Sequence, residues 1–272
     1  MTTKTILITG ASSGIGKATA RFFHEKGWNV IATMRSPGKE TELSRLDNVL
    51  VTRLDVQDAV SIADAVAEGL ARFGAIDVLL NNAGYGAYGV LEATSLASIR
   101  RQFEVNVIGL LATTRAVLPH FRSRRSGIVI NISSIGGKMT FPLGTLYHGS
   151  KFAVEGLSES LSFEMAEIGG QVKIVEPGII KTEFGGGSLE FNNDERLAEY
   201  QPMVGKLLAA MEPFQASASP PDLVAQVIYQ AATDGSDRLR YPAGPDAETI
   251  LAHRKAVDDA TFLGGIRSQF GL

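Results

Sequence analysis

The chain has 272 residues, a length that one α/β domain can fill, so a single domain over 1–272 is the expectation. Its 44% hydrophobic and 20% charged residues are ordinary for a globular protein and exclude a disordered or collagen-like chain. Lys and Arg total 26 against 29 Asp and Glu. The resulting net charge of −3 gives no global reason to expect nucleic acid or an anionic membrane as a partner.

Cysteine is absent from the sequence, which excludes disulfides, thiolate metal ligands and cysteine nucleophiles. We predict no metal site. The N-terminus turns polar and glycine-rich too early for a secretory signal, and no stretch approaches the roughly 20 apolar residues of a membrane span. These features predict a cytoplasmic protein with no membrane partner.

Short apolar runs alternate with longer amphipathic stretches along most of the chain. The predicted strands, expected to be buried on both faces, are 6–8, 30–33, 49–53, 78–80, 128–132 and 172–175. The predicted helices are 15–26, 61–73, 99–122 and 152–168. Repeated βα units predict an α/β fold of Rossmann type, a single-domain doubly wound parallel sheet with helices on both faces. Ligands bind such a sheet at the carboxyl ends of its strands.

The alternation loosens after Pro177. We expect residues 4–182 to form the core and residues of about 183–221 to form a small C-terminal substrate lid, hinged at glycines 185–187 and helical in its second half. A helix over 223–232 is expected to return to the sheet, and 238–241 to form a last short strand. The tail from Ala247 is expected to form a helix and a coil.

A glycine-rich turn, Thr9-Gly10-Ala11-Ser12-Ser13-Gly14-Ile15-Gly16, joins the first predicted strand to the first predicted helix. Glycines permit positive φ and close backbone approach, and the helix start supplies free N–H groups and a partial positive charge. This context favours binding of a pyrophosphate. A tight turn that only packs the strand on the helix is the alternative.

The ends of the second and third predicted strands carry groups that suit a nucleotide. A residue that reads a ribose 2′-hydroxyl would be acidic and about 20 residues beyond the glycines, where this chain has Met34 and Arg35. A guanidinium can bind the 2′-phosphate of NADP, so Arg35 favours NADP; an exposed loop arginine is the alternative. Asp55 suits either a hydrogen bond from an adenine amino group or the N-cap of the next helix.

Amide side chains follow in the next two elements. The fourth predicted strand ends in Asn81-Asn82-Ala83-Gly84, which either passes under a cofactor or forms an ordinary turn. Asn106 lies between Val105 and Val107 inside an apolar helix, where a buried amide is unfavourable unless it is hydrogen bonded. It therefore either kinks the helix by bonding its carbonyls or binds a functional water molecule.

A Tyr and a Lys stand four residues apart in Tyr147-His148-Gly149-Ser150-Lys151, and Ser134 precedes the Tyr by thirteen residues. Positions i and i+4 of a helix share a face, so the ammonium of Lys151 would lie near the phenol of Tyr147. That charge should lower the pKa of the phenol from about 10, as a general acid/base requires. An exposed Tyr–Lys pair is the alternative, and His148 is expected at the surface.

Together these motifs resemble the classical short-chain dehydrogenase/reductase family over residues 4–182. The matching patterns are Thr9-Gly10-x3-Gly14-x-Gly16, Asn81-Asn82-Ala83-Gly84, Asn106, Ser134, Tyr147-x3-Lys151 and Pro177-Gly178-x3-Thr182. The resemblance implies an oxidoreductase that interconverts a carbonyl and a primary or secondary alcohol by hydride transfer, with NADP(H) preferred and NAD(H) as a second cofactor. It also implies a homodimer or homotetramer.

The resemblance implies a role for each matching residue. Tyr147 would be the general acid/base and Ser134 would hold the substrate oxygen. Lys151 would bind the nicotinamide ribose, and Asn106 would hold the water of a proton relay. The cofactor would contact Gly10, Ser12, Ser13, Gly14, Ile15, Gly16, Arg35, Asp55, Val56, Asn82, Ala83, Gly84, Tyr147, Lys151, Pro177, Gly178, Ile180 and Thr182.

The sequence departs from the family's pattern at one position that bears on the cofactor, and two other functions are alternatives. Many NADP-preferring members have a second basic residue at the position of Ser13, so only Arg35, helped by Lys17 or Lys39, would meet the phosphate. A cofactor-binding regulator without turnover is the alternative function, against which the intact catalytic residues count. Sugar epimerisation or dehydration is disfavoured by the short length beyond Pro177.

The substrate would be a small molecule bound by Ser134, Met139, Phe141, Tyr147 and Phe184. This apolar wall favours a ketone, aldehyde or secondary alcohol of moderate size over a phosphorylated or acidic metabolite. The alternative is that these apolar residues only pack the lid onto the sheet.

Overall fold

The computed structural model describes residues 3–182, 188–216 and 218–272, with side chains left out at 211–216. Seven parallel strands form the central sheet in the order β3-β2-β1-β4-β6-β7-β9. They are β1 (Thr5–Ile8), β2 (Asn29–Met34), β3 (Val49–Arg53), β4 (Val78–Asn81), β6 (Ile128–Ile132), β7 (Gln171–Pro177) and β9 (Arg240–Ala243). The strand order reverses between β1 and β4, which confirms the predicted doubly wound sheet.

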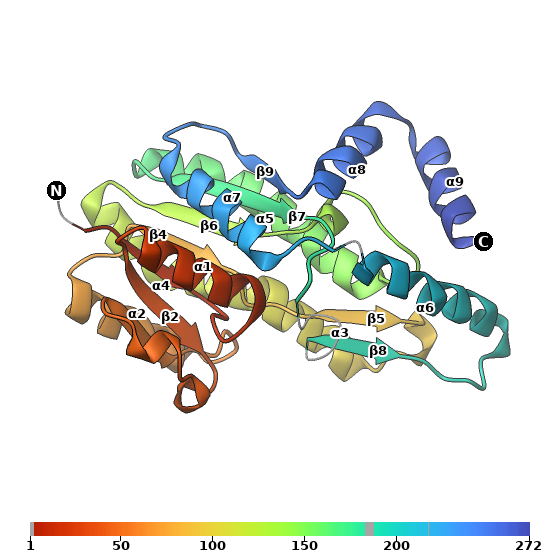
Figure 1. The fold of residues 1–272 in the computed structure, drawn as a ribbon, viewed down its shortest axis with the longest axis horizontal. Coiled ribbons are helices and arrows are strands. Elements are labelled where there is room, and N and C mark those ends of the chain that lie inside the picture. The colour runs from red at the N-terminus through yellow and green to blue at the C-terminus, as the bar shows by residue number, and fades with distance from the viewer. Residues whose placement is uncertain (1–2, 183–187, 217) are drawn as a thin grey trace.

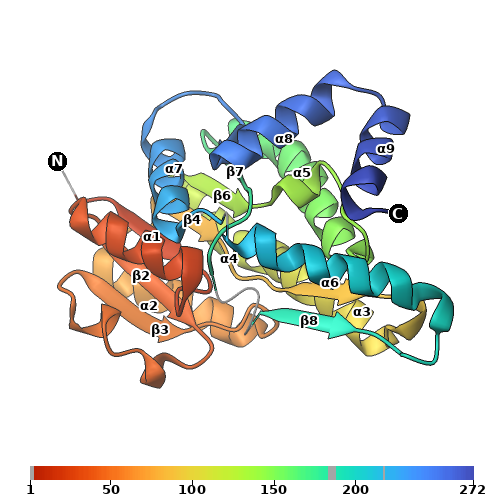
Figure 2. The same ribbon diagram turned by 45° about the vertical axis from the view of Figure 1, so that its right-hand side comes forward.

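Helices cover both faces of the sheet (Figures 1 and 2). One layer contains α1 (Gly14–Glu25) and α7 (Pro221–Thr233), which pack against each other. The other layer contains α2 (Ala59–Phe73), α4 (Gly109–Arg124) and α5 (Thr145–Glu167). A ligand cannot approach the sheet through either face, so its strand ends are the accessible part.

Alternation of side chains along each strand builds two cores. Ile6 and Ile8 pack with Phe23 of α1 on one face, while Leu7 packs with Phe121 of α4 on the other. Because both neighbours of such a strand are apolar layers, its sequence is a continuous apolar run. The strand predicted over 49–53 differs, since β3 is the edge of the sheet and its residues are half-buried or exposed.

Helix boundaries differ from the prediction at two places that matter for the site. The helix predicted over 152–168 begins at Thr145, seven residues earlier, so Tyr147 lies in its first turn. The helix predicted over 99–122 is divided into α3 (Leu96–Phe103), a π-helical turn (Glu104–Ile108) and α4.

A second, two-stranded sheet was not predicted. It pairs β5 (Gly86–Gly89) with β8 (Leu189–Asn192), which joins the turn after β4 to the segment beyond the core. The second half of the predicted lid is helical, as expected, in α6 (Gln201–Ala216). The hinge glycines 185–187 and Phe184 lie outside the described residues.

The tail forms two helices instead of the expected helix and coil: α8 (Pro245–Ala256) and α9 (Asp259–Phe270). The side chain of Asp258 accepts a hydrogen bond from the Thr261 N–H, and this N-cap starts α9. Short 3₁₀ turns occupy Pro37–Lys39, Leu43–Arg45, Leu91–Ala93, Ile135–Gly137 and Ala198–Tyr200. Within the described ranges, no helix combines the length and apolar character needed to cross a membrane.

Candidate active site

A cavity of about 600 Å³ opens at the carboxyl ends of the parallel strands, where the fold predicts a ligand site. It collects most of the predicted site residues, namely Gly10, Ser12, Ser13, Gly14, Ile15, Arg35, Asp55, Val56, Asn82, Ala83, Gly84, Ser134, Phe141, Tyr147, Lys151, Pro177, Gly178, Ile180 and Thr182. Gly16, Asn106 and Met139 are buried outside its lining. The contacts with ligands predicted for all of these residues, inside and outside the lining, stay predictions.

The glycine-rich turn after β1 is shaped by both backbone conformation and packing. Gly10 and Gly14 have φ of 69° and 54°, which favour glycine. A Cβ at Gly16 would lie 2.3 Å from the carbonyl oxygen of Gly10, so this glycine permits close packing of α1 on the strand. The side-chain amide of Asn82 donates to the carbonyls of Thr9 and Gly10, at 2.9 and 3.0 Å. The turn and the end of β4 are thus tied together.

The first turn of α1 is open to a ligand. Ser13 occupies its N-cap position, and its own side chain makes no capping hydrogen bond. The leading N–H groups of a helix point out of its N-terminus and carry partial positive charge. An anion at this edge of the cavity would therefore find uncapped donors.

Arg35 lines the cavity with an exposed side chain after β2. Lys17, its expected helper, is held instead by Glu40 at 3.3 Å and Glu42 at 2.9 Å. The sequence shows these glutamates but not their contact with Lys17. The charge of Lys17 is therefore compensated by two carboxylates. Arg35 lines the cavity and forms no such ion pair with a described residue.

Asp55 lines the cavity and does not cap α2. Its carboxylate accepts a hydrogen bond from the Gln57 N–H at 3.1 Å, closing a turn. The N-cap is Asp58, whose carboxylate accepts from the N–H groups of Val60 and Ser61. The alternative that Asp55 caps α2 is wrong, because the capping residue lies three positions later.

Asn106 lies in the π-helical turn, but its amide does not bond the carbonyls of its own helix. Its Nδ2 donates to the carbonyl of Tyr85 at 2.9 Å and to Oγ of Ser150 at 3.1 Å, while its Oδ1 accepts from the Tyr85 N–H. Ser150 in turn donates to the carbonyl of Tyr147. Asn106 therefore joins Tyr85, in the segment between β4 and β5, to the first turns of α5.

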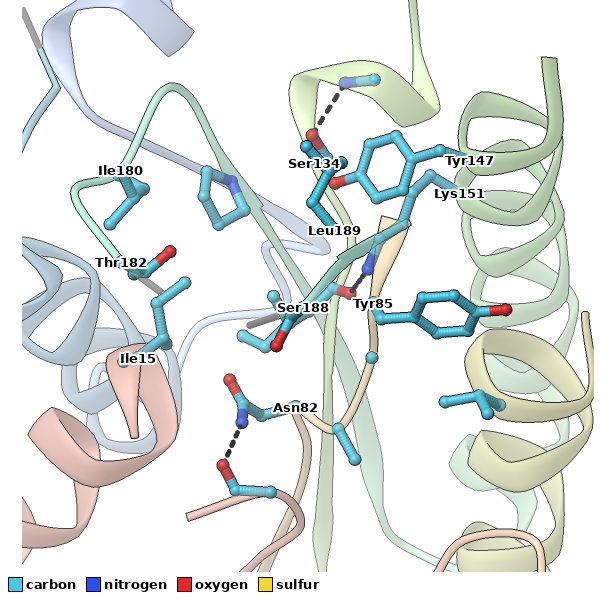
Figure 3. A pocket seen from close by; sticks show the side chains of 18 of the residues that line it. Ile15, Asn82, Tyr85, Ser134, Tyr147, Lys151, Ile180, Thr182, Ser188 and Leu189 are labelled. Atoms are coloured by element: carbon cyan, nitrogen blue, oxygen red, sulfur yellow. Dashed lines mark hydrogen bonds between the residues drawn. The ribbon is translucent and has the colours of Figure 1, made fainter. Parts of the chain in front are cut away.

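Ser134, Tyr147 and Lys151 meet at the wall of the cavity. The hydroxyl of Ser134 accepts the Gly136 N–H at 3.0 Å and lies beside the phenol oxygen of Tyr147 (Figure 3). The ammonium of Lys151 donates to the carbonyl of Ile132 at 2.8 Å and lies 5.8 Å from the centre of the Tyr147 ring. The predicted shared helix face is thus observed.

The acid–base properties of this group differ from the expectation. Burial raises the pKa of Tyr147, while its hydrogen bond with Ser134 acts in the opposite direction. Burial also lowers the pKa of Lys151 to about 8. Spacing along a helix predicts that the ammonium is close, but not that both groups lose water. The predicted lowering of the phenol pKa is therefore not found.

His148 was expected at the surface, and this is wrong. Only 3% of it is exposed, because α5 starts early enough for its first turn to pack under the loop after β6. Its Nε2 accepts the Phe141 N–H and its Nδ1 faces the carbonyl of Gly136, both at 3.0 Å. Sequence spacing carries no signal for this position.

The apolar end of the cavity is built from distant segments. Phe141, Phe191, Leu207 and Phe270 line it. Phe141 was expected near the substrate, but Phe270 of α9 was not. Phe270 is 4% exposed, and its ring centre lies 5.8 Å from that of Phe141. The tail has no motif that could have identified it.

Comparison with known proteins identifies the family. Residues 4–192 match the model of the short chain dehydrogenase family, so the chain belongs to that family and is an oxidoreductase by descent. The matched range contains every motif named above. It ends before α6 and the helices of the tail.

Similar proteins span nearly the whole chain. An uncharacterized oxidoreductase of Schizosaccharomyces pombe is 51% identical over 88% of this chain and 100% of its own length. The 3-ketodihydrosphingosine reductase of Bacteroides thetaiotaomicron is 34% identical over 92% and 91%. A short-chain dehydrogenase from Streptomyces avermitilis has a TM-score of 0.82 at 36% identity, covering 93% and 92%. ElxO with NADP bound has a TM-score of 0.72 at 29% identity, covering 88% and 97%.

Proposed function

We propose that the protein is an NADP(H)-dependent oxidoreductase that interconverts a carbonyl and a primary or secondary alcohol, with Tyr147 as the general acid/base. The observation that carries the proposal is the meeting of the Ser134 hydroxyl, the Tyr147 phenol and the Lys151 ammonium at one wall of the cavity. A regulator without turnover would have no chemical use for this arrangement.

The residues around the cavity fit a nicotinamide dinucleotide, which supplies or accepts the hydride when it is bound. The uncapped start of α1 would hold the pyrophosphate, and Asp55 would meet the adenine. The end of β7 at Pro177 and the loop after it, with Gly178, Ile180 and Thr182, would hold the nicotinamide end.

Arg35 is our reason for preferring NADP(H) over NAD(H). A guanidinium binds a phosphate through charge-assisted hydrogen bonds, whereas an NAD-specific site would place a carboxylate here. Lys17 is already paired with two glutamates, so Arg35 would act largely alone. The NADP bound to ElxO supports the same cofactor. NAD(H) would be used with lower affinity.

The chain's own groups would handle the proton. Tyr147 is protonated at neutral pH, because burial raises its pKa, and it would donate that proton to the carbonyl oxygen during reduction. Ser134 would hold the same oxygen, since the Gly136 N–H already directs the Ser134 hydroxyl toward the phenol. Lys151, with a pKa near 8, could return a proton to Tyr147.

The substrate would be apolar near the reacting carbonyl. Tyr88, Phe141, Phe191, Leu207 and Phe270 line that end of the cavity. Arg101 and Glu190, which also line it, form an ion pair at 3.3 Å and so offer little net charge to an acidic metabolite. The relation to a 3-ketodihydrosphingosine reductase supports a ketone as the reducible group.

Oxidation of NADPH, and of NADH in parallel, against a panel of apolar ketones, aldehydes and quinones tests this function. We expect turnover with at least one carbonyl, preference for NADPH, and loss of turnover in Tyr147→Phe. Binding of NADPH without turnover across the panel would favour the regulator, and binding of neither cofactor would overturn the site.

A further inference from the structure

His148 connects the catalytic helix to the loop that forms the cavity wall. Its ring is buried beside Tyr147 and also lines the cavity. One nitrogen contacts the backbone of Gly136 and the other contacts the backbone of Phe141, both at 3.0 Å. The two contacts span the loop from the end of β6 to the apolar wall.

The partners of the ring fix its tautomer. The Phe141 N–H can only donate, so Nε2 must present its lone pair. The Gly136 carbonyl can only accept, so Nδ1 must carry the hydrogen. A second proton on Nε2 would face a donor, and burial also lowers the pKa of His148. The ring is therefore a neutral link with one donor and one acceptor, both used.

The surroundings of the ring leave room for no larger neighbour. A Cβ at Gly144 would lie 2.3 Å from Cδ2 of His148, and one at Gly136 would lie 2.7 Å from Nδ1. Ring centres of Tyr88, Tyr147 and Phe141 lie 5.9, 5.6 and 6.1 Å from that of the histidine. The ring is thus held by packing as well as by its hydrogen bonds.

Gly136 passes the effect of His148 to the reacting group. Its carbonyl accepts from His148, while its N–H donates to the hydroxyl of Ser134. Moving Gly136 would therefore turn the hydroxyl that lies beside the Tyr147 phenol (Figure 3). Moving Phe141 would shift an apolar wall of the cavity.

We propose that His148 is a positioning residue that sets Ser134 through Gly136 and the apolar substrate wall through Phe141. The inference rests on the proposed function, since it assigns consequences to the carbonyl reaction. The two hydrogen bonds serve different ends: the Nδ1 contact supports the chemical step, and the Nε2 contact supports binding of the apolar part of the substrate.

Three substitutions separate the two contacts. His148→Phe keeps an aromatic ring but removes both. His148→Asn retains an amide donor near the place of Nδ1, and His148→Gln retains an amide oxygen near the place of Nε2. We expect His148→Phe to lower kcat and raise KM for an apolar ketone, together reducing kcat/KM about tenfold to a hundredfold. Asn should largely restore kcat, Gln should largely restore KM, and NADPH affinity should stay within about twofold of wild type.

The nitrogen chemical shifts of His148 in isotope-labelled wild-type protein provide a readout that needs no substrate. We expect a neutral ring protonated on Nδ1. Protonation on Nε2 would overturn the proposal, and so would wild-type kcat and KM in His148→Phe or equal losses in all three variants. If His148→Phe fails to fold, the other two variants test the proposal: His148→Asn should retain kcat and His148→Gln should retain KM.

Failure of the proposed function has a different signature. It would appear as no carbonyl turnover by the wild-type protein with either cofactor. In that case hydrogen exchange of the Phe141 amide would still test the hydrogen bond between Phe141 and His148. Slow exchange in wild type and fast exchange in folded His148→Asn, which lacks the Nε2 acceptor, would support it. Equal exchange in the two proteins would overturn it.

Discussion

Lys151 donates its ammonium to the carbonyl oxygen of Ile132, at 2.8 Å, at the carboxyl end of β6. The same ammonium lies 5.8 Å from the centre of the Tyr147 ring. Burial lowers the pKa of Lys151 to about 8, with Glu155 one helical turn further acting in the opposite direction. The Lys charge at this wall is therefore sensitive to pH in the range where the enzyme would work.

The reductive reaction should weaken at alkaline pH. Lys151 loses its proton as pH rises through about 8, so it can no longer return one to Tyr147. We expect kcat/KM for carbonyl reduction to fall above about pH 8 and the profile for alcohol oxidation to rise over the same range. A reductive profile that stays flat well beyond this range would contradict the role of Lys151.

Replacing Arg35 by Ala should weaken NADPH binding while leaving NADH binding nearly unchanged. Loss of charge-assisted bonds to a phosphate corresponds to an increase in Kd of about tenfold to a hundredfold. Cofactor titration of both proteins measures the change. Arg53→Ala is the matched control, because Arg53 is paired with Asp58 and does not line the cavity. Equal losses for both cofactors in Arg35→Ala would remove the argument for NADP preference.

Glu176 should make stability fall as pH rises toward neutrality. It is 3% exposed, and burial, followed by the nearby carboxylate of Glu155, raises its pKa to about 7. Between its ordinary pKa of 4.5 and about 7, the native state binds more protons than the unfolded state, so the free energy of unfolding decreases with pH. The contribution is fully present below 4.5 and is lost as pH rises through about 7.

Glu176→Gln mimics the protonated form and should remove this dependence. From about pH 5 to about pH 8, we expect the variant to gain up to about 3 kcal/mol in free energy of unfolding relative to wild type. Denaturant unfolding at several pH values measures this difference, with the exposed Glu164→Gln as control. A constant difference between Glu176→Gln and wild type would show that Glu176 is ionised throughout.

Phe270→Ala should weaken binding of large apolar carbonyls. The ring closes one end of the cavity against Phe141, so its removal takes away contact area without touching the reacting groups. We expect KM to rise roughly tenfold for a bulky apolar ketone with little change in kcat. Phe262→Ala is the control, since Phe262 is buried on the same helix but does not line the cavity. Similar effects of both substitutions would indicate a general loosening of the tail.

The inner strands of the central sheet could be predicted because they lie between two apolar layers, as Ile6 and Leu7 on opposite faces of β1 show. The pairing of Gly86 with Leu189 could not, since glycines lack strand propensity and the partners are a hundred residues apart. The Tyr–Lys spacing predicted a shared face correctly. Burial of His148 and the direction of the Tyr147 pKa depend on how the loop after β6 packs on α5, which local sequence does not encode.

Two further outcomes could not be predicted from the spacing of residues in the sequence. Phe270 reaches the cavity because α9 packs on α6, where Val204 and Leu207 share an apolar cluster with it. Asp58 caps α2 in place of Asp55 because the turn at Gln57 delays the helix start. Both outcomes are set by tertiary packing and turn geometry.

Transfer of label from NADPH deuterated at its transferable hydrogen to an apolar ketone tests the central claim most directly. We expect the alcohol product to carry deuterium at the former carbonyl carbon with wild-type protein and with Tyr229→Phe, whose ring packs on α1 away from the cavity. Tyr147→Phe should form labelled product about a hundredfold to ten-thousandfold more slowly while still binding NADPH. Unlabelled product, or undiminished labelling in Tyr147→Phe, would contradict the proposed reaction.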